Sequence, residues 1–468
     1  MYIGLLYQEG IISMQIEKNL NTPARKRLEL LFDDGSFTEI NSFTMEKDSL
    51  AGVISAYGYV NGSPVYAFSQ DKSVNGGAVG TAHAAKIAKL YSLAAKTGTP
   101  VVGIYDSNGA FVDGSADSLN AYSEMISASS VISGVVPQIS IIMGTCAGSA
   151  AILACSSDFV IMTKDSEFFV APPFDTKKNG VGTAKACAAA GVAHAVCDSD
   201  EDAVKKAKAV LNLMPANNLA SAPMFETDEN NTVLSSGDIK SIVEAVADTD
   251  SAVELSADFG KAAYTALASV NGSSVGIIAT NKADSRLTAD DCDKLARFIR
   301  TCDAFSLPVI TFVDTEGFDA DSEAELAGSV RDMTKLANCY AEATTVKISV
   351  ITGKAIGPAF VALAGKNLNT DFTLAWENAV ISPLAPVTAV EFLWHDRLKG
   401  AENLSAKRNE LAEEFSNTVA SAVSAAERNA VDEVIAPEDT RKVLVSALDI
   451  LAGKRVSKLP KKHSNIPF

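Results

Sequence analysis

Two stretches of sequence decide the fold: ISIIMGTCAGSA at residues 139–150 and ISVITGKAIGPA at residues 348–359. They align without a gap, so that Gly148 matches Gly357. Each reads as a buried apolar strand that runs into a glycine-containing turn and then into a helix of small residues. Such a match between two halves of the chain indicates an internally duplicated fold.

The duplication continues on the N-terminal side of both stretches. Asn-Gly pairs at Asn61 and Asn271 separate runs rich in β-forming residues, as in a hairpin. Helical patterns follow at residues 83–98 and 292–306, and each leads into another apolar strand. This succession predicts two α/β units of similar topology, with right-handed crossovers between parallel strands.

Length and composition agree with two large globular domains. The chain has 468 residues, of which 47% are hydrophobic and 21% are charged, and ordinary domains contain roughly 100 to 200 residues. The polar stretch from Pro215 to Asp238 separates the two halves. We therefore predict one domain over residues 1–222 and a second over residues 223–468.

Charge and cysteine content exclude several functional classes. Lys and Arg number 40 against 57 for Asp and Glu, a net charge of −17, which argues against nucleic acid as a partner. The seven cysteines contain no CxxC pair and the opening residues lack the features of a cleavable signal, so we expect free thiols and a cytoplasmic location. Residues 1–14 are interpreted as an ordered arm or an over-extended start.

The two glycine turns are the strongest candidates for chemistry. A turn from a strand into a helix presents backbone N–H groups at the positive end of the helix dipole, where an oxygen anion is stabilised. A thioester enolate or a ureido oxyanion would suit such a site. Close packing of small residues is the commoner reason for a single turn of this kind, but its recurrence at matched positions favours function.

Two other kinds of site have weaker support. GTCAG could be a nucleophile elbow with Cys146 in the serine position, yet the later histidines show no triad context. The four histidines lie far apart and no HExxH, CxxC or carboxylate cluster is present, so no metal site is predicted. His83 is interpreted as a packing or helix-surface residue.

Glycine-rich and basic segments give two further indications. NGGAVG at residues 75–80 could admit a phosphate or a thioester chain close to the backbone, although it lacks the spacing of a nucleotide loop. The basic runs at residues 24–27 and 454–463 are interpreted as solvated surface or subunit interface, and less readily as contacts for the polyanion coenzyme A.

Several longer motifs occur in a characteristic order. The first half contains ARKRLELLFDDGSFTEI, QDKSVNGGAVGTAHAAKI, IYDSNGA and PQISIIMGTCAGSAA, and the second contains TCDAFSLPVITFVDTEGF, YAEATTVKISVITGKAIGPAF and KKHSNIPF. In these motifs the chain resembles the biotin-dependent acyl-CoA carboxyltransferases, of the propionyl-CoA carboxylase β chain and methylmalonyl-CoA decarboxylase α subunit type. The resemblance spans nearly the whole chain.

The resemblance implies two tandem crotonase-like (ClpP/crotonase) domains related by internal duplication, the first on the acyl-CoA side and the second on the biotin side. It also implies a head-to-tail homodimer, or a hexamer built as a trimer of such dimers. Carboxybiotin would release CO2, the biotin ureido anion would take the acyl α-proton, and the enolate would attack CO2. Decarboxylation would be the reverse.

The resemblance also assigns residues to this chemistry. Gly148 and Ser149 would hold the thioester enolate, and Gly357 and Ala359 would hold the ureido oxygen of biotin. The expected substrate-binding residues are Gly76, Gly77, Asn108, Gly109 and Ala110.

Biotin is expected to arrive on another protein. The chain has neither an AMKM-like biotinylation motif nor an ATP-grasp glycine loop. The implied partners are therefore an acyl-CoA, a biotin carboxyl carrier protein, and a biotin carboxylase subunit or a membrane decarboxylase subunit. Propionyl-, methylmalonyl-, malonyl- and glutaconyl-CoA all stay open as the acyl substrate.

Departures from the family pattern concern the predicted site. The family's DSGGAR reads DSNGAF here, with Asn108 and Phe111, its CAGGA reads CAGSA, and the loop after Pro172 looks shortened. Pro358, which has no N–H, stands where the second turn of the family has its second glycine. Two alternatives stay open: a crotonase-like CoA enzyme without biotin chemistry, and a non-catalytic scaffold subunit of a carboxylase complex.

Overall fold

The computed structural model of the chain describes residues 21–172, 180–227, 230, 232, 234, 237–280 and 286–466. The predicted N-terminal arm and the loop that follows Pro172 lie outside the described residues. The chain divides into two compact units, Met1–Ala220 and Ser221–Phe468. The predicted domain boundary lies two residues from this division.

The first unit is built on a mixed sheet. Within its described residues the strand order is β1-β4-β5-β6-β7-β8-β10, with β9 beside β7. β4 runs antiparallel to both of its neighbours, β1 and β5. All the other neighbouring pairs of this sheet are parallel. The strands are β1 (Thr38–Ile40), β2 (Met45–Glu46), β3 (Ser49–Leu50), β4 (Val53–Val60), β5 (Ser63–Gln70), β6 (Val101–Ser107), β7 (Gln138–Ala147), β8 (Phe159–Thr163), β9 (Glu167–Phe169) and β10 (Ala195–Cys197). The helices are α2 (Pro23–Leu31), α3 (Thr81–Thr97), α4 (Ala116–Ile132), α5 (Ser149–Cys155), α7 (Ala184–Ala189) and α8 (Asp200–Leu213).

The second unit is built in the same way. Its described strands follow the order β11-β12-β13-β15-β17-β18-β20, with β19 beside β17. The strands are β11 (Val253–Leu255), β12 (Tyr264–Val270), β13 (Ser273–Ala279), β14 (Arg286–Leu287), β15 (Val309–Thr315), β16 (Gly317–Phe318), β17 (Lys347–Ile356), β18 (Phe372–Trp376), β19 (Val380–Ser382) and β20 (Glu433–Ile435). The helices are α9 (Ile239–Val246), α10 (Ala289–Ala304), α11 (Ser322–Ala327), α12 (Val330–Glu342), α13 (Pro358–Ala364), α14 (Pro386–Leu393), α15 (His395–Leu398), α16 (Leu404–Asn417), α17 (Ala422–Glu427) and α18 (Thr440–Leu451).

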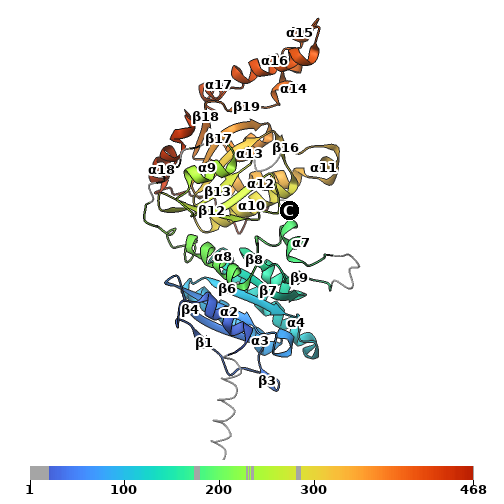
Figure 1. The fold of residues 1–468 in the computed structure, drawn as a ribbon, viewed down its shortest axis with the longest axis vertical. Coiled ribbons are helices and arrows are strands. Elements are labelled where there is room, and N and C mark those ends of the chain that lie inside the picture. The colour runs from blue at the N-terminus through green and yellow to red at the C-terminus, as the bar shows by residue number, and fades with distance from the viewer. Residues whose placement is uncertain are drawn as a thin grey trace, which may run out of the picture. The chain divides into compact units, whose positions relative to one another are not determined.

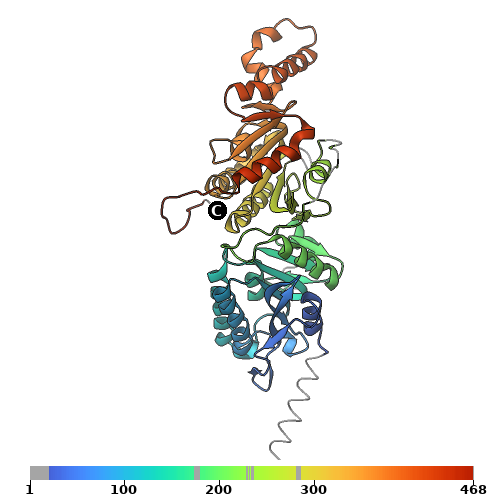
Figure 2. The same cartoon turned by 90° about the vertical axis from the view of Figure 1, so that its left-hand side faces the viewer.

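The two units thus repeat one topology. In each, a hairpin leads into a run of parallel strands, and the short strand β9 or β19 pairs with the ten-residue strand β7 or β17. The helix pairs α3–α4 and α10–α12 pack in corresponding positions (Figures 1 and 2). The second unit differs by an insertion, α14 to α16, which extends from its sheet and has a small core around Leu411 and Phe415 (Figure 1).

Both predicted Asn-Gly turns close the hairpins. Residues 61–62 and 271–272 all have positive φ angles, between 48° and 79°, which is the geometry that continues the right-handed twist of the flanking strands. One carboxylate accepts both amides of each turn. Asp33 does so in the first unit, at 3.0 and 2.9 Å, and Asp248 does so in the second, at 2.8 and 2.9 Å.

A buried lysine fixes the first long helix of each sheet. Lys86 of α3 is 3% exposed, and its ammonium donates to the carbonyl oxygen of Val53 at 2.6 Å. Lys294 of α10 makes the same contact with the carbonyl oxygen of Ala263 at 2.7 Å. Burial lowers the pKa of Lys86 to about 8. The duplication therefore extends to buried side chains.

Candidate active site

Both glycine turns lie at the carboxyl ends of parallel strands. Gly148 follows β7 and Gly357 follows β17, which are inner strands of the two sheets. In open α/β sheets ligands bind at this edge, because loops from neighbouring strands meet there. Each unit therefore has a candidate site at the carboxyl edge of its sheet.

The first turn depends on the conformation of Gly148. This residue adopts φ 63° and ψ −128°, a combination that glycine reaches far more easily than other residues. Its N–H donates to the carbonyl oxygen of Phe169 in β9 at 2.9 Å. The Gly148 amide is therefore occupied, whereas Ser149 of the predicted pair meets no acceptor among the described residues. Gly148 contributes the shape of the turn.

Free amides begin directly after Gly148. Ser149 and Ala150 open α5, where N–H groups have no acceptor inside the helix, and the described chain holds no acceptor for either. Ala151 is already bonded, since its N–H donates to the carbonyl oxygen of Gly148 at 3.1 Å. The turn thus presents two adjacent donors at the carboxyl edge of the sheet.

The structure brings the predicted substrate-binding residues together beside this turn. The glycine-rich loop runs along the segment that follows β6. Asn108 N–H donates to the Gly76 carbonyl oxygen at 3.0 Å, and Val79 N–H donates to the Gly109 carbonyl oxygen at 2.9 Å. A Cβ on Gly77 would lie 2.4 Å from a backbone oxygen of the β6 strand end, so the two segments approach as closely as only glycine allows.

This pairing leaves Ala110 as a further donor, with no acceptor for its N–H among the residues that the structure describes. Its two neighbours both bond to Val79, so the N–H of Ala110 points to the opposite side of the segment. A Cβ on Gly109 would lie 3.2 Å from the carbonyl oxygen of Ala147, which places this segment at the end of β7. Ala110 and Ser149 therefore offer N–H groups at the same edge.

A buried ion pair packs against β7 shortly before the first turn. Arg27 donates to Asp106 Oδ2 at 3.0 Å and to the carbonyl oxygen of Met143 at 2.6 Å. A Cβ on Gly144 would lie 2.1 Å from Asp106 Oδ1, so β7 can pass the carboxylate only as glycine. The interpretation of the first basic run as solvated surface is wrong for Arg27, which is 8% exposed.

The helix that follows the glycine-rich loop has no free N-terminus. Glu46 Oε2 accepts from the N–H groups of Ala82 and His83 at 2.9 and 3.0 Å. A Cβ on Gly80 would lie 2.5 Å from the Glu46 carboxyl carbon. This carboxylate takes the position that a phosphate would need at α3, so the loop approaches a ligand through its backbone and not through this helix end.

The second turn repeats the shape of the first with fewer donors. Gly357 adopts φ 60° and ψ −138°, and its N–H donates to the carbonyl oxygen of Ser382 in β19 at 2.8 Å. Pro358 has no N–H, and Phe360 donates to the Gly357 carbonyl oxygen at 3.2 Å. Ala359 is therefore the early residue of this turn whose N–H meets no acceptor in the described chain.

A second strand end also reaches this turn. A Cβ on Gly317 would lie 3.3 Å from the carbonyl oxygen of Ile356, just as one on Gly109 would lie 3.2 Å from that of Ala147 in the first unit. Phe318 pairs with Leu287 of β14, and Asp319 N–H donates to the Leu287 carbonyl oxygen at 2.8 Å. The parallel pattern turns the Phe318 N–H toward the other side. Sequence reasoning missed Phe318, although its position after Gly317 matches Ala110 after Gly109.

Comparison with known proteins decides the family. The carboxyl transferase domain matches residues 17–466. The chain belongs to the carboxyl transferase family. It is 37% identical over 480 residues to the methylmalonyl-CoA decarboxylase subunit alpha of Veillonella parvula, covering 95% of this chain and 93% of that one. It is also 37% identical to the mitochondrial propionyl-CoA carboxylase beta chain of Rattus norvegicus, covering 95% and 88%.

A solved structure gives the same result for the fold of this carboxyltransferase. Transcarboxylase 12S, with hydrolysed methylmalonyl-coenzyme A bound, matches with a TM-score of 0.91 at 33% identity, covering 100% of this chain and 98% of that one. These similarities confirm the predicted family and the α/β fold of two tandem crotonase-like domains. They also confirm the predicted function, the carboxyltransferase component of a biotin-dependent acyl-CoA carboxylase or decarboxylase.

The nucleophile-elbow alternative has no support in the carboxyltransferase. Cys146 is fully buried, and burial raises the pKa of its thiol. His83 is also buried, with a pKa lowered to about 3 by loss of solvent, and it contacts Gln70. His194 accepts from Val160 N–H at 3.0 Å. Cys146 therefore packs as a neutral thiol, and His83 is a packing residue.

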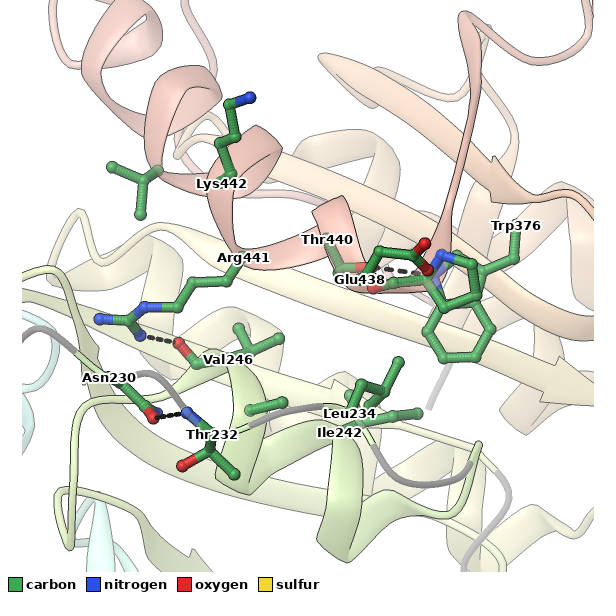
Figure 3. Close-up of a pocket in the computed structure, with 13 residues that line it drawn as sticks. Asn230, Thr232, Leu234, Ile242, Val246, Trp376, Glu438, Thr440, Arg441 and Lys442 are labelled. Carbon is green, nitrogen blue, oxygen red and sulfur yellow. Dashed lines mark hydrogen bonds between the residues drawn. The ribbon is translucent and has the colours of Figure 1, made fainter.

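A pocket of about 450 Å3 in the second unit lies apart from the predicted residues. Figure 3 shows its wall, where Arg441 points at Val246 and Trp376 lies beside Thr440. The Trp376 N–H donates to Thr440 Oγ1 at 2.9 Å, and Arg441 also pairs with Asp248. These polar groups satisfy one another.

Among the described helices of the chain, none is long and apolar enough to cross a membrane.

Proposed function

We propose that this carboxyltransferase moves a carboxyl group between carboxybiotin on a separate carrier protein and the α-carbon of an acyl-CoA. The first turn would hold the thioester oxygen, and the second would hold the ureido oxygen of biotin. The observation that carries the proposal is the repeated geometry: in each unit a glycine with φ near 60° places unbonded backbone amides at the carboxyl edge of the sheet.

In the first unit, the thioester oxygen would accept from Ser149 N–H and Ala110 N–H. Backbone donors that are already in place stabilise the negative charge of an enolate without the cost of reorientation. Gly148 sets the direction of the turn. The predicted substrate-binding residues line the approach to this point: Gly76, Gly77, Asn108 and Gly109. No side chain here needs to act as an acid or a base.

The second unit would bind the ureido oxygen of biotin through backbone N–H donors. Ala359 N–H and Phe318 N–H would donate to the ureido oxygen, with Gly357 again setting the turn. Bound carboxybiotin supplies CO2 and, after its release, a base strong enough to take the α-proton. Pro358 leaves this side with one donor fewer than the matching first turn.

The acyl substrate that we propose is the methylmalonyl-CoA and propionyl-CoA pair. Methylmalonyl-CoA decarboxylase and propionyl-CoA carboxylase subunits, at 37% identity over most of their length, are named for the two members of this pair. The bound ligand of transcarboxylase 12S is hydrolysed methylmalonyl-coenzyme A. The two names differ in reaction direction, which the partner subunits would set.

The implied partners follow from the same proposal. A biotin carboxyl carrier protein would bring the biotin, and a biotin carboxylase subunit or a membrane decarboxylase subunit would load or unload it. Transcarboxylase 12S is described as a hexamer, and we expect a homodimer or a hexamer here, with first units facing second units of neighbouring chains. The seven free cysteines support the cytoplasm as the location.

The test uses the purified chain with methylmalonyl-CoA and free biotin. Formation of propionyl-CoA that depends on added biotin is expected, and Ser149→Ala, which keeps the backbone amide, is expected to behave like the wild type. Conversion without any need for biotin would favour the crotonase-like alternative. Tight binding of propionyl-CoA with no conversion in either direction would favour a scaffold subunit and overturn the proposal.

A further inference from the structure

An ion pair stands beside the second turn. Lys354 lies on β17 shortly before Gly357, and its N–H donates to Asp314 Oδ1 at 2.8 Å. Its ammonium pairs with the carboxylate of Glu316, in the short connection between β15 and β16. Gly317, the next residue, is held by a hydrogen bond from its N–H to Thr315 Oγ1 at 3.2 Å. The pair is therefore fixed at the carboxyl edge of the sheet.

The first unit has no such pair at the matching positions. Thr145 stands where the second unit has Lys354, and Asn108 stands where it has Glu316, so both side chains are neutral. An ammonium group is nevertheless present. Lys72, which follows β5, donates to Thr145 Oγ1 at 2.9 Å and lies 3.6 Å from Asp106 Oδ1. Non-equivalent lysines thus place a positive charge at the same edge in both units.

Stability gives little reason for this recurrence. The side chains of Lys72 and Lys354 are 46% and 49% exposed, and ion pairs at that exposure stabilise a fold by at most about 1 kcal/mol. A buried lysine would be explained by packing, as for Lys86, but these two are not buried. An exposed ammonium that recurs beside two ligand-binding turns is better explained by an anionic ligand.

We propose that Lys354 is a binding residue beside the second turn. Its ammonium donates to an oxygen anion of the biotin headgroup, and Glu316 is its counter-ion in the free enzyme. This inference rests on the proposed function. Pro358 removes one backbone donor from the turn, and an ammonium group can replace it because a charged donor makes a stronger hydrogen bond than an amide. Glu316 holds the ammonium at the edge until the ligand competes for it.

The experiment compares biotin-dependent conversion of methylmalonyl-CoA in four variants. Lys354→Met is expected to lower kcat/KM for biotin by about tenfold to a hundredfold, and Lys354→Arg is expected to keep most of it. Glu316→Gln is expected to lower KM for biotin severalfold, since biotin then no longer competes with a carboxylate for the Lys354 ammonium. Lys366→Met is the matched control, because it removes another lysine ion pair of the same unit, with Asp432.

A binding measurement separates the inference from the proposed function. Saturation-transfer NMR with biotin methyl ester is expected to show weaker binding to Lys354→Met than to Lys366→Met, with propionyl-CoA affinity equal in both. In the Pro358→Gly background, which restores an amide, the cost of Lys354→Met should shrink. Equal biotin binding and equal turnover of the Lys354 and Lys366 variants would overturn the inference, whereas turnover without biotin in the wild type would overturn the function.

Discussion

The two turns of this chain share a shape and differ in chemistry. Gly148 and Gly357 adopt nearly the same φ and ψ, and each donates its N–H to the short strand that pairs with the end of β7 or β17, which is β9 or β19. The next residue is Ser149 in one turn and Pro358 in the other, so the number of free amides differs. The fold needs the glycine, while the following residue sets how many amides of the turn have no acceptor among the described residues.

The first prediction turns the first site into a copy of the second. Ser149→Pro removes an amide donor and is expected to lower kcat for carboxyl transfer by about 100-fold or more, roughly 3 kcal/mol of transition-state stabilisation. Proline is tolerated at the first position of a helix, as Pro358 shows, so folding should survive. The measurement is turnover of methylmalonyl-CoA, with circular dichroism as a check of the fold.

Ser149→Ala is the control for this variant, since it keeps the amide and loses only the hydroxyl. It is expected to stay within a few-fold of the wild type. If Ser149→Pro also turned over normally while folded, the first turn could not be the enolate site, and the comparison of donors between the units would lose its meaning.

The second prediction concerns the support beneath each turn. A Cβ on Gly144 would lie 2.1 Å from an Asp106 oxygen, and one on Gly353 would lie 2.4 Å from the Asp314 carboxyl. Asp106 is also pinned by Arg27. Substitution by alanine is therefore expected to cost about 3 kcal/mol of unfolding free energy at Gly144 and about 2 kcal/mol at Gly353. Denaturant unfolding of both variants measures the difference, and a reversed order would contradict the rigid role given to the arginine.

The third prediction makes the second turn more like the first. Pro358→Gly restores an amide and is expected to raise biotin-dependent turnover about tenfold, a smaller effect than the loss at Ser149 because Phe318, Ala359 and Lys354 would still donate on the proposed biotin side. The rate with saturating acyl-CoA and varied biotin is the measurement. A rate that falls, in a folded protein, would show that proline itself shapes the biotin side.

The fourth prediction concerns acid, and its effect is the smallest. Three residues before the buried lysine, α3 carries His83 whereas α10 carries Asp291. Burial lowers the pKa of His83 from 6.5 to about 3, so the unfolded chain binds a proton below pH 6.5 that the folded chain does not. Stability is therefore lost as the pH falls from 6.5 toward 3, by about 1 kcal/mol near pH 6.

His83→Gln should remove this part of the acid sensitivity. The free energy of unfolding of the variant at pH 6 should then be nearly the same as its value at pH 8. Urea unfolding at both pH values tests it. An equally steep loss in the variant would mean that other groups, and not His83, carry the acid response.

Much of this architecture was predictable because it is local or repeated. The Asn-Gly turns, the helices near residues 83–98 and 292–306, and the glycine turns each follow from a few adjacent residues. The neighbourhood of Asn108 and Gly76 was also expected, through the family resemblance, and the structure places them in contact.

What could not be predicted depends on partners that are distant in sequence. The occupied amide of Gly148 requires Phe169, which β9 brings back beside β7. Arg27 meets Asp106 from 79 residues away, and nothing in its basic surroundings indicates burial. Glu46 likewise reaches α3 only through a small hairpin. A local pattern cannot encode which of many distant groups will satisfy a given donor.

The buried lysine of α3 has a consequence for damage to the enzyme itself. A protein that binds acyl thioesters is exposed to non-enzymatic acylation of its own amines, and an amine with a pKa near 8 is more often deprotonated and nucleophilic at neutral pH than an ordinary lysine. Lys86 has such a pKa, yet it is 3% exposed and bonded to Val53. Acylation at Lys86 should therefore be absent from folded protein and appear, by peptide mass spectrometry, only in chains whose first unit has opened. Acylated Lys86 would therefore report that the first unit has opened.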